Sequence, residues 1–338
     1  MDFLAVGDLV VDAFIRLKDA HVTCRIDNTA CEICMRWGDK IPFESATVVP
    51  AVGNSANAAV SAARLGLVSG LRAYVGDDRD GAQCIASLGA DQVDTAYVEK
   101  QAGKKTNYHY VLWFEGQRTI LVKHETFEYR VPTVAEPPQW LYLSSLGENS
   151  VSYHAQWVEY LLAHPTVKLA FQPGTYQIAF SKAHPYWENH KDVFAEIYQR
   201  SHIVFCNKEE AERILGIEPV QDPKQLLMQM KALGPQIVVI TDDVRGATAV
   251  DEQNNFWFIP RYPDPRPPYE ITGAGDAFAS TTVAALQLGK NLQEALMWGA
   301  TNASAVLQEI GAQKGLLTRI QLEKNLANPP APFAVRAL

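Results

Sequence analysis

The sequence predicts an α/β fold in which a mostly parallel central sheet lies between two layers of helices, with a small β lid added to it. Three observations lead to this prediction: short apolar segments recur along the chain, helical patterns separate them, and two segments break the alternation. Strand followed by helix, repeated, is typical of a parallel sheet covered on both faces. Ligands of such sheets collect beyond the carboxyl ends of the strands.

Six apolar segments have the length and composition of buried strands, and each stops at a glycine or a polar residue. They are residues 3–7, 71–76, 140–147, 167–174, 202–207 and 237–243. Helical periodicity marks five segments between them. These are residues 55–66, 150–164, 191–200, 208–216 and 223–234.

Two further segments, residues 14–49 and 105–127, interrupt this order. The first lacks a clear helical pattern, and the second alternates around Glu115-Gly116-Gln117 as a β-hairpin does. Apolar side chains lie on both faces of the hairpin's first arm, which suits a small sheet that covers something. We interpret both segments as a lid over the main sheet; an ordinary antiparallel edge of that sheet is the alternative.

The composition is that of an ordinary globular protein, with 338 residues, 47% hydrophobic residues and a net charge of -8. No basic run is present, so we expect no nucleic-acid partner. No apolar run reaches the roughly 18 residues of a membrane span, and three acidic residues near the start make a poor signal peptide. The 5 cysteines, an odd number spread through the chain, are not typical of a disulfide framework, so we expect a cytoplasmic protein.

Four residues of the first lid segment have a spacing that could bind zinc. His21, Cys24, Cys31 and Cys34 offer nitrogen and sulfur ligands. The loop between the two pairs is shorter than usual, and Met35 and Trp37 lie nearby. The alternative is that the cysteines are small apolar side chains in a reduced protein.

The stretch from Gly273 to Asp276 combines a glycine-rich turn with one carboxylate before a run of small residues. Gly273, Ala274 and Gly275 allow successive N–H groups to point into one space, and the positive end of the following helix adds to them. Such a turn can hold the charge of a transferring phosphoryl group while Asp276 accepts a hydroxyl proton. A tight turn with an N-cap aspartate is the alternative.

Other polar residues at expected strand and helix ends suit the remaining parts of such a reaction. Asp12, Asn54 and Asn57 could hold the hydroxyls of a sugar, although each could also be a cap or turn residue. Magnesium prefers oxygen ligands and keeps several waters, so Asn207 and Glu210 could hold it beside a nucleotide. No Walker-type phosphate loop and no dinucleotide-binding glycine motif is present.

Residues 271–278, ITGAGDAF, closely resemble the C-terminal signature DTxGAGDxF of the ribokinase-like, or PfkB, carbohydrate kinase family. Further similarities follow the family's order along nearly the whole chain. AVGDLVVD is similar to its first strand, VGNSANAAVSAARLG resembles its signature GGxxxNxAxxxARLG, and NKEE fits its NxxE motif. The resemblance implies a single ribokinase-like α/β/α domain over residues 1–338, acting as a kinase.

The same resemblance implies how the acceptor is bound and activated. Asp12, at the end of the first strand, would bind sugar hydroxyls together with Gly53 and Asn57. Asp276 would remove a proton from a hydroxymethyl group, and the amides from Gly273 to Asp276 would form the anion hole. The substrate would be a sugar or sugar derivative, and the phosphoryl donor ATP.

For the nucleotide, the resemblance implies that Asn207 and Glu210 help to hold Mg2+ near the phosphates. Thr241 and Gly246 remain from the family's nucleotide-binding turn, and Asn302 resembles a residue beside the adenine pocket. Lid sheets of two subunits often pack together in this family, so a homodimer is expected.

Several positions depart from the family pattern. Glu270-Ile271 replaces an Asp-Thr pair that often shapes a monovalent-cation site, so activation by K+ is not implied. Val52 replaces the first of two paired glycines. Asp242-Asp243 brings two acids toward the triphosphate, which is unfavourable unless they face away or meet a metal. Gln172 stands where many members have an aspartate, so the usual sugars are not implied as substrates.

Two alternatives follow from these departures. The first is a nucleoside kinase of the same family, with Tyr108, Tyr110 or Trp113 stacking on a base. The second is a catalytically inactive relative that binds a metabolite as a sensor. Asp276, Asn207 and Glu210 are retained, which favours an active kinase.

Overall fold

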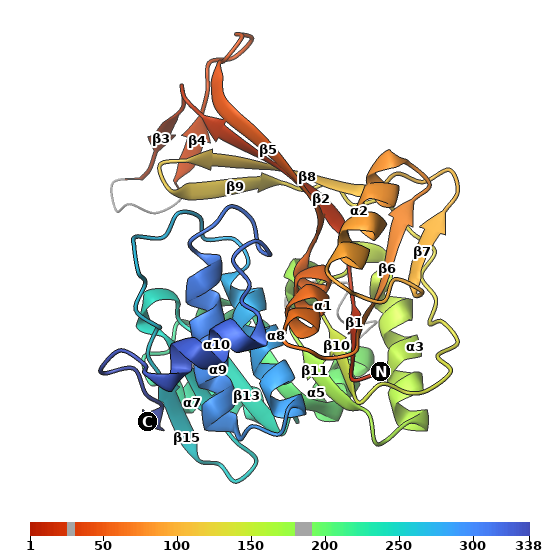
Figure 1. The fold of residues 1–338 in the computed structure, drawn as a ribbon, viewed down its shortest axis with the longest axis vertical. Helices are drawn as coiled ribbons and strands as arrows, with labels where there is room; N and C mark the ends of the chain where they lie inside the picture. The colour runs from red at the N-terminus through yellow and green to blue at the C-terminus, as the bar shows by residue number, and fades with distance from the viewer. Residues whose placement is uncertain (26–30, 180–190) are drawn as a thin grey trace.

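The computed structural model describes residues 1–25, 31–179 and 191–338. A ten-stranded sheet forms its centre, with helices on both faces (Figure 1). From one edge to the other the strands are β16 (Arg336–Ala337), β15 (Phe256–Ile259), β14 (Ala247–Val250), β13 (Ile237–Thr241), β12 (Ser201–Asn207), β11 (Lys168–Phe171), β10 (Trp140–Leu143), β1 (Phe3–Val6), β6 (Ser69–Gly76) and β7 (Val98–Gln101). Pairs from β7 to β13 are parallel and pairs from β13 to β16 antiparallel. The predicted α/β fold with a mostly parallel sheet is confirmed.

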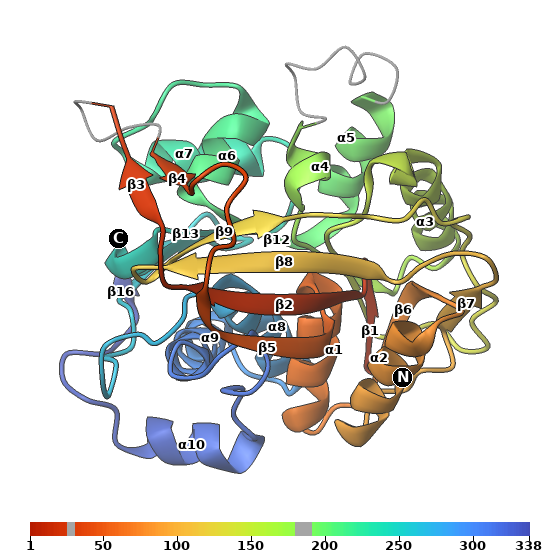
Figure 2. The same ribbon diagram turned by 90° about the horizontal axis from the view of Figure 1, so that it is seen from above.

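Two helical layers enclose this large sheet, as the view from above shows (Figure 2). One layer contains α1 (Asn54–Arg64), α2 (Arg79–Ala90), α8 (Ala274–Gln287), α9 (Leu292–Val306) and α10 (Arg319–Ala327), and the other contains α3 (Val151–Ala163), α4 (Thr175–Ala179), α5 (Lys191–Arg200), α6 (Lys208–Leu215) and α7 (Pro223–Lys231). In β1, Phe3 and Ala5 pack under the first layer, whereas Leu4 and Val6 pack under the second. Successive side chains of a strand point to opposite faces, so a strand buried on both faces is an unbroken apolar run. In the described ranges, no helix is long and apolar enough to cross a membrane.

A second, smaller sheet lies across one end of the molecule (Figure 1). Its strands, in order, are β5 (Phe43–Val52), β2 (Val10–Leu17), β8 (Asn107–Phe114) and β9 (Gln117–Leu121). The hairpin predicted around Glu115-Gly116-Gln117 is present, and Glu115 and Gly116 have the positive φ angles, 48° and 78°, that a tight hairpin turn requires. Because the hairpin pairs with β2 and not with the large sheet, the alternative of an ordinary sheet edge is wrong.

The first strand ends earlier than predicted. β1 stops at Val6, and β2 starts at Val10 in the small sheet, so Asp12 is the third residue of β2 and does not end the first strand. The small sheet also extends beyond the predicted segments 14–49 and 105–127, since β2 begins at Val10 and β5 continues to Val52. Residues 3–14 are buried throughout and mostly apolar, so their composition gives no sign of the point where the chain changes sheets.

The zinc hypothesis is wrong for the described residues. Cys24 and Cys31 form a disulfide bond next to the short ribbon of β3 (His21–Thr23) and β4 (Glu32–Cys34). A thiol in a disulfide cannot ligate zinc as a thiolate. No group of three or more His, Cys, Asp or Glu side chains capable of holding a metal occurs in the part of the chain that the structure describes. The expectation of reduced cysteines holds only for Cys34, Cys84 and Cys206.

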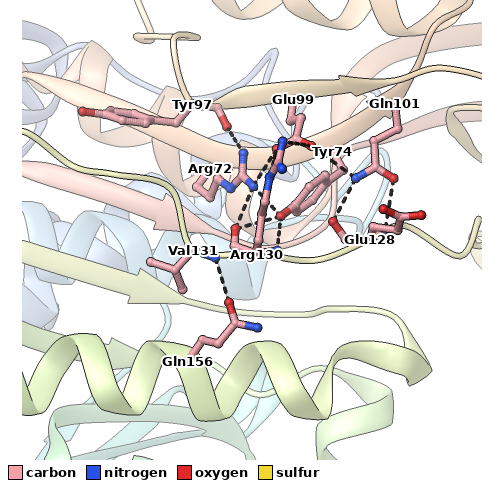
Figure 3. A network of polar contacts seen from close by, with 9 residues as sticks. All are labelled: Arg72, Tyr74, Tyr97, Glu99, Gln101, Glu128, Arg130, Val131 and Gln156. Carbon is pink, nitrogen blue, oxygen red and sulfur yellow. Dashed lines mark hydrogen bonds and ion pairs between the residues drawn. The ribbon is translucent and has the colours of Figure 1, made fainter.

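A buried polar network fastens the segment that returns from β9 to β10 (Figure 3). Arg72 of β6 is 3% exposed and donates to the carbonyl of Arg130 at 2.8 Å and to Glu99 at 3.0 Å. The hydroxyl of Tyr74 accepts a hydrogen bond from the Arg130 backbone N–H at 2.6 Å. A buried guanidinium is tolerated only when its charge and its donors are matched. The network therefore fixes residues 128–131 against β6 and β7.

Candidate active site

Two hollows adjoin at the edge where the parallel strands end. The inner hollow, about 610 Å³, is lined by residues of both sheets, including Asp12 of β2, Gln172 after β11 and Asp276 of α8. The outer hollow, about 630 Å³, lies over the ends of β12 and β13 and reaches α9. The two hollows share the lining residues Arg118, Asn207, Thr241, Ile271, Gly275 and Phe278.

The fold brings nearly all the predicted site residues to these two hollows. Those that line the inner hollow are Asp12, Gly53, Asn54, Asn57, Glu210, Gly273 and Asp276. Those that line the outer hollow are Gly246 and Ala274, and those that line both are Asn207, Thr241 and Gly275. Parallel strands place their carboxyl ends at one edge, which is why residues far apart in the chain meet here.

Asp276 lies in the first turn of α8, and two side-chain amides hold its carboxylate. Asn57 of α1 donates to Oδ2 at 2.7 Å, and Gln172 donates to Oδ1 at 3.0 Å. Asn57 is oriented in turn by Gln313, whose amide donates to it at 3.0 Å, and Gln172 accepts a hydrogen bond from the buried hydroxyl of Tyr142. The carboxylate is therefore fixed from two sides by residues of three different elements.

The surroundings of Asp276 raise its pKa. Burial, which disfavours the charged carboxylate, is the largest cause, whereas the amides of Asn57 and Gln172 and the charge of Arg118 lower the pKa. A general base needs a pKa closer to the working pH than that of a free carboxylate. Burial thus makes Asp276 a better proton acceptor, while the two amides keep it ionised.

The turn before α8 has the geometry expected of an anion hole. α8 begins at Ala274, two residues earlier than the predicted start near Asp276. Gly273 has a φ of 82°, and a Cβ there would lie 2.2 Å from the Cβ of Ala312, so only glycine fits. No side chain caps the helix, which leaves its first N–H groups to a ligand. Nothing lies within 4 Å of a Cβ placed on Gly275, so the turn is open on the side of the hollows.

Gly53 occupies the corresponding position before α1. Its φ is 112°, and a Cβ there would lie 2.7 Å from the Asp8 carbonyl oxygen. Asn54 and Asn57 then follow on the face of α1 that lines the inner hollow, opposite Asp12 of the small sheet. The glycine therefore allows α1 to begin close to β2, with its polar residues facing the carboxylate.

Asn207 and Glu210 form a capping box at the start of α6. The Asn207 side chain accepts from the Glu210 N–H at 2.8 Å, and Glu210 accepts from the Asn207 N–H at 2.8 Å. Burial is the main cause that raises the pKa of Glu210, and Asp276 raises it further. One carboxylate and one amide make a sparse donor set. They fit a magnesium ion that keeps most of its waters and binds phosphate oxygens, not one enclosed by protein.

Arg245 accounts for one of the two acids beside the nucleotide turn, Asp242. A short 3-10 helix, Asp243–Arg245, follows β13, and Arg245 binds Asp242 at 2.7 Å. This ion pair offsets the charge of Asp242 and is the largest cause that lowers its pKa. Gly246 has a φ of 94°, and a Cβ there would lie 2.2 Å from the Ile259 carbonyl oxygen. The turn that carries Thr241 and Gly246 thus keeps its glycine for a steric reason.

Asn302 requires a correction, because it lines neither hollow. It is fully buried in α9, where its amide donates to Thr281 of α8 at 2.7 Å and its oxygen accepts from the Leu317 N–H at 2.8 Å. Its neighbours Ala303 and Ser304 line the outer hollow. The helix was predicted correctly. The packing of α9 about its axis, which the sequence does not give, turns the Asn302 side chain toward α8 and away from the outer hollow.

The sequence profile of the pfkB family carbohydrate kinases matches residues 43–319, more than half of the chain. The chain belongs to the PfkB carbohydrate kinase family. Bacillus subtilis (strain 168) ribokinase is 26% identical over 298 residues, which are 86% of this chain and 92% of that protein. The cytidine kinase of Thermococcus kodakarensis is 35% identical over 122 residues, but these cover only 36% of this chain and 42% of that protein.

Solved structures agree on the fold. Arabidopsis thaliana ribokinase, complexed with ribose and ATP, has a TM-score of 0.77 at 19% identity, covering 97% of this chain and 99% of that one. The nucleoside kinase of Methanocaldococcus jannaschii has a TM-score of 0.75 at 18% identity, covering 96% and 98%. As a PfkB family member, the protein is a phosphotransferase, a sugar or nucleoside kinase.

Three residues of this PfkB kinase that line its site were missed from the sequence. His109 of β8 and His124 after β9 line the inner hollow, and Arg118 of β9 lines both hollows. The period-2 alternation of the hairpin already placed His109 on the face opposite Tyr108 and Tyr110. Which of the two faces looks inward could not be read from the sequence, because neither face is polar throughout.

The three aromatic residues considered for base stacking do not line the hollows. Tyr108 packs against the apolar core, Tyr110 is 47% exposed, and Trp113 packs against Tyr269 with a ring distance of 5.2 Å. The rings that do line the inner hollow are His109, His124, Tyr176, Phe205 and Phe278. A stacking role for Tyr108, Tyr110 or Trp113 is therefore wrong in this structure.

Glu270, which departs from the PfkB pattern together with Ile271, makes its contacts with other residues of the protein. Glu270 is 3% exposed and accepts hydrogen bonds from the N–H and the hydroxyl of Thr272. The guanidinium of Arg118 lies 3.9 Å from its carboxylate. Arg118 thus places a positive charge beside this buried carboxylate.

Proposed function

We propose that the protein transfers the γ-phosphoryl group of ATP to the hydroxymethyl group of a sugar or sugar derivative. The observation that carries this proposal is the position of Asp276: a carboxylate held by two amides, at the uncapped start of α8, where the inner and outer hollows meet. A proton acceptor and an anion hole at the junction of two hollows suit in-line transfer between two bound substrates.

In this mechanism the acceptor occupies the inner hollow, with its hydroxyls on Asp12, Gly53, Asn54 and Asn57. Asp276 takes the proton of the hydroxymethyl group, and the oxygen attacks the γ-phosphorus. The bond between the γ-phosphorus and the bridging oxygen breaks, and ADP leaves with that oxygen. The N–H groups from Ala274 to Asp276 hold the charge of the transferring group.

Arg118 adds charge stabilisation at the same point. Among the described residues it is the only arginine or lysine that lines both hollows. One of its guanidinium nitrogens, Nη1, is buried without a hydrogen-bond partner. A cation at the junction can interact with the phosphoryl group throughout its transfer.

The nucleotide would lie in the outer hollow, with Thr241 and Gly246 beside its phosphates. Asn207 and Glu210 would hold Mg2+ through its waters, and the ion would neutralise phosphate charge. An Escherichia coli putative ribokinase II, solved in complex with ATP and Mg2+, matches this chain with a TM-score of 0.71 at 16% identity, covering 96% and 99%.

A nucleoside acceptor is the second candidate, favoured by the local similarity to cytidine kinase and by the imidazole and phenol rings of the inner hollow. ADP release with a panel of ribose, fructose and gluconate derivatives beside adenosine and cytidine distinguishes the two. A sensor without catalysis would release ADP with none of them.

The role of Asp276 is tested by Asp276→Asn, which keeps the shape but removes the proton acceptor. We expect kcat to fall about 10²- to 10⁴-fold, with the affinities for acceptor and ATP nearly unchanged. Steady-state kinetics and isothermal titration calorimetry measure both. Asp19→Asn, at an exposed position outside both hollows, is the control. Turnover of Asp276→Asn at the wild-type rate would refute the mechanism.

We further propose a homodimer formed through the small sheet, working in the cytoplasm where ATP is supplied. Val48, Ala13, Tyr110 and Leu121 lie in register across its four strands, and Val48, Tyr110 and Leu121 are about half exposed, at 54%, 47% and 53%. The next residue on β2, Asp12, points the other way into the inner hollow. One face of the sheet is thus apolar and open, and a second copy of the same face would cover it.

A further inference from the structure

Four side chains stand in a row at the wall of the inner hollow. Asp12 Oδ1 lies 3.4 Å from Nδ1 of His109, Nε2 of His109 lies 3.3 Å from Nε2 of His124, and Nδ1 of His124 lies 3.1 Å from Oδ2 of Asp8. Both histidine side chains are 15% exposed. Among the described residues, only the contact between the two imidazoles is a hydrogen bond, whereas the two contacts with carboxylates lie at ion-pair distance without hydrogen-bond geometry. The row is largely shielded from solvent.

The row joins the two sheets. Asp8 follows β1 of the large sheet, Asp12 and His109 are register partners on β2 and β8, and His124 follows β9. Asp8 also faces the Tyr129 hydroxyl, at 3.4 Å, in the segment that the Arg72 network fastens. One end of the row is thus anchored on the rigid part of the molecule, and the other end faces the acceptor site.

The hydrogen atoms of the row can be counted. A carboxylate only accepts, so each of the two contacts with a carboxylate is attractive only if the facing Nδ1 carries a proton. A neutral imidazole carries only one, which would leave two Nε2 lone pairs facing each other at 3.3 Å. Two protons between the rings would be equally unfavourable. The distances are therefore satisfied when one additional proton lies between the two Nε2 atoms, giving one positive charge between two carboxylates.

We propose that His109 and His124 are positioning residues that share one proton and thereby hold the Asp12 carboxylate in place for the acceptor hydroxyls. This inference rests on the proposed function, in which Asp12 binds the acceptor. Oδ1 of Asp12 is buried and makes no hydrogen bond within the described protein. The ion pair with His109 engages Oδ1 of the carboxylate, so Oδ2 remains available to hydroxyl donors.

The other groups that face the row do not supply its proton. Tyr176 of α4 packs edge-on against His124 with ring centres 6.0 Å apart, and burial raises the pKa of Tyr129, which stays neutral. Arg118 and Asp276 line the same hollow from β9 and α8. Because the charges of Arg118 and Asp276 are opposite, they offset each other. The histidine pair is then the cation next to Asp12.

Proton sharing is tested without any substrate. In ¹H–¹⁵N spectra of the wild-type protein over a pH series, we expect both Nδ1 atoms to be protonated and one proton to be shared by the two Nε2 atoms. When either histidine is replaced, the ¹⁵N signal of the remaining ring should change as well. His164→Gln, which removes the histidine at the C-cap of α3, away from the hollows, is the control and should leave both signals unchanged. Independent protonation of the two rings would overturn the proposal.

The positioning role is tested by kinetics with three variants. His109→Leu removes both contacts, and we expect it to raise the acceptor KM about tenfold while kcat and the KM for ATP change less than about twofold. His109→Asn keeps a donor for Asp12 and should restore most of the affinity. His124→Leu should raise the acceptor KM less than His109→Leu, since it acts only through His109.

An unchanged acceptor KM in His109→Leu, with a melting temperature like that of the wild type, would also overturn the proposal. An equal rise of the acceptor KM in His109→Leu and His109→Asn would overturn it as well. The proposed function fails in a different way, by the absence of ADP release with every acceptor while the shared proton is still seen. The two failures are thus distinguishable.

Discussion

At the scale of single residues, the contact between Gln172 and Asp276 tunes the reaction most directly. The Gln172 amide donates to the carboxylate of Asp276, the proposed base, at 3.0 Å and is itself oriented by Tyr142. A donated hydrogen bond stabilises the charged form of a carboxylate and so lowers its pKa. The substitution that distinguishes this chain from many family members therefore acts on the base as well as on the acceptor site.

Gln172→Met removes this donor at similar volume and should move the acidic limb of the kcat–pH profile to higher pH. The sign follows from Asp276: its pKa is already raised by burial, losing the donor raises the pKa further, and the base must be ionised to act. The kcat loss should therefore be larger at pH 6 than at pH 8. Gln199→Met, at an exposed site on α5, is the control. An acidic limb that stays in place would contradict this role.

At the scale of elements, the starts of helices carry most of the chemistry. The N-cap residues of α1, α6 and α8 are Gly53, Asn207 and Gly273, and all three helix starts lie at the edge where the parallel strands end. α6 is capped by its own side chains, whereas α1 and α8 begin at glycines without side-chain caps. Uncapped helix starts leave N–H donors for ligands, and the capped start leaves a carboxylate and an amide for a hydrated metal.

Glu210→Gln should raise the Mg2+ concentration needed for half-maximal rate about tenfold, because outer-sphere partners of a metal typically contribute that much to its affinity. The capping hydrogen bond survives, since glutamine also accepts. Glu294→Gln is a matched control, because Asn291 and Glu294 form the same capping box on α9, away from both hollows. Magnesium titrations monitored by ADP release provide the measurement. Equal titrations for the two variants would exclude Glu210 from the metal site.

At the scale of the whole molecule, the two faces of the small sheet have opposite functions. Its inward face supplies Asp12, His109 and Ile120 to the inner hollow, while the register row of Val48, Tyr110 and Leu121 points outward. In the proposed dimer the open apolar face would meet a second copy, while the other face would contribute Asp12 and His109 to the proposed acceptor site.

Val48→Asp combined with Leu121→Asp should convert the dimer to a monomer. Both side chains are about half exposed in a single chain, at 54% and 53%, so the melting temperature of the monomer should change little beyond the loss of association. Sedimentation velocity measures the change. Leu162→Asp, 67% exposed on α3, should leave the dimer intact. A wild-type protein that sediments as a monomer would refute assembly through this sheet.

The sequence by itself determined the layers, six strands of the large sheet, the hairpin and the chemistry of the turn before α8. These depend on local patterns: apolar runs, glycines that allow positive φ, and residues at strand and helix ends. The family motifs carried the site residues for the same reason, since each motif is a continuous piece of chain.

Only the tertiary structure decided which side chains meet. The pairs Gln172 with Asp276 and His109 with His124, the inward rotation of Asn302, the disulfide of Cys24 with Cys31 and the place of Arg118 between two hollows involve contacts that no local pattern encodes. The face of β8 that looks inward is set by its pairing with β2. That pairing joins residues about a hundred positions apart, and its register follows from the packing of the whole chain.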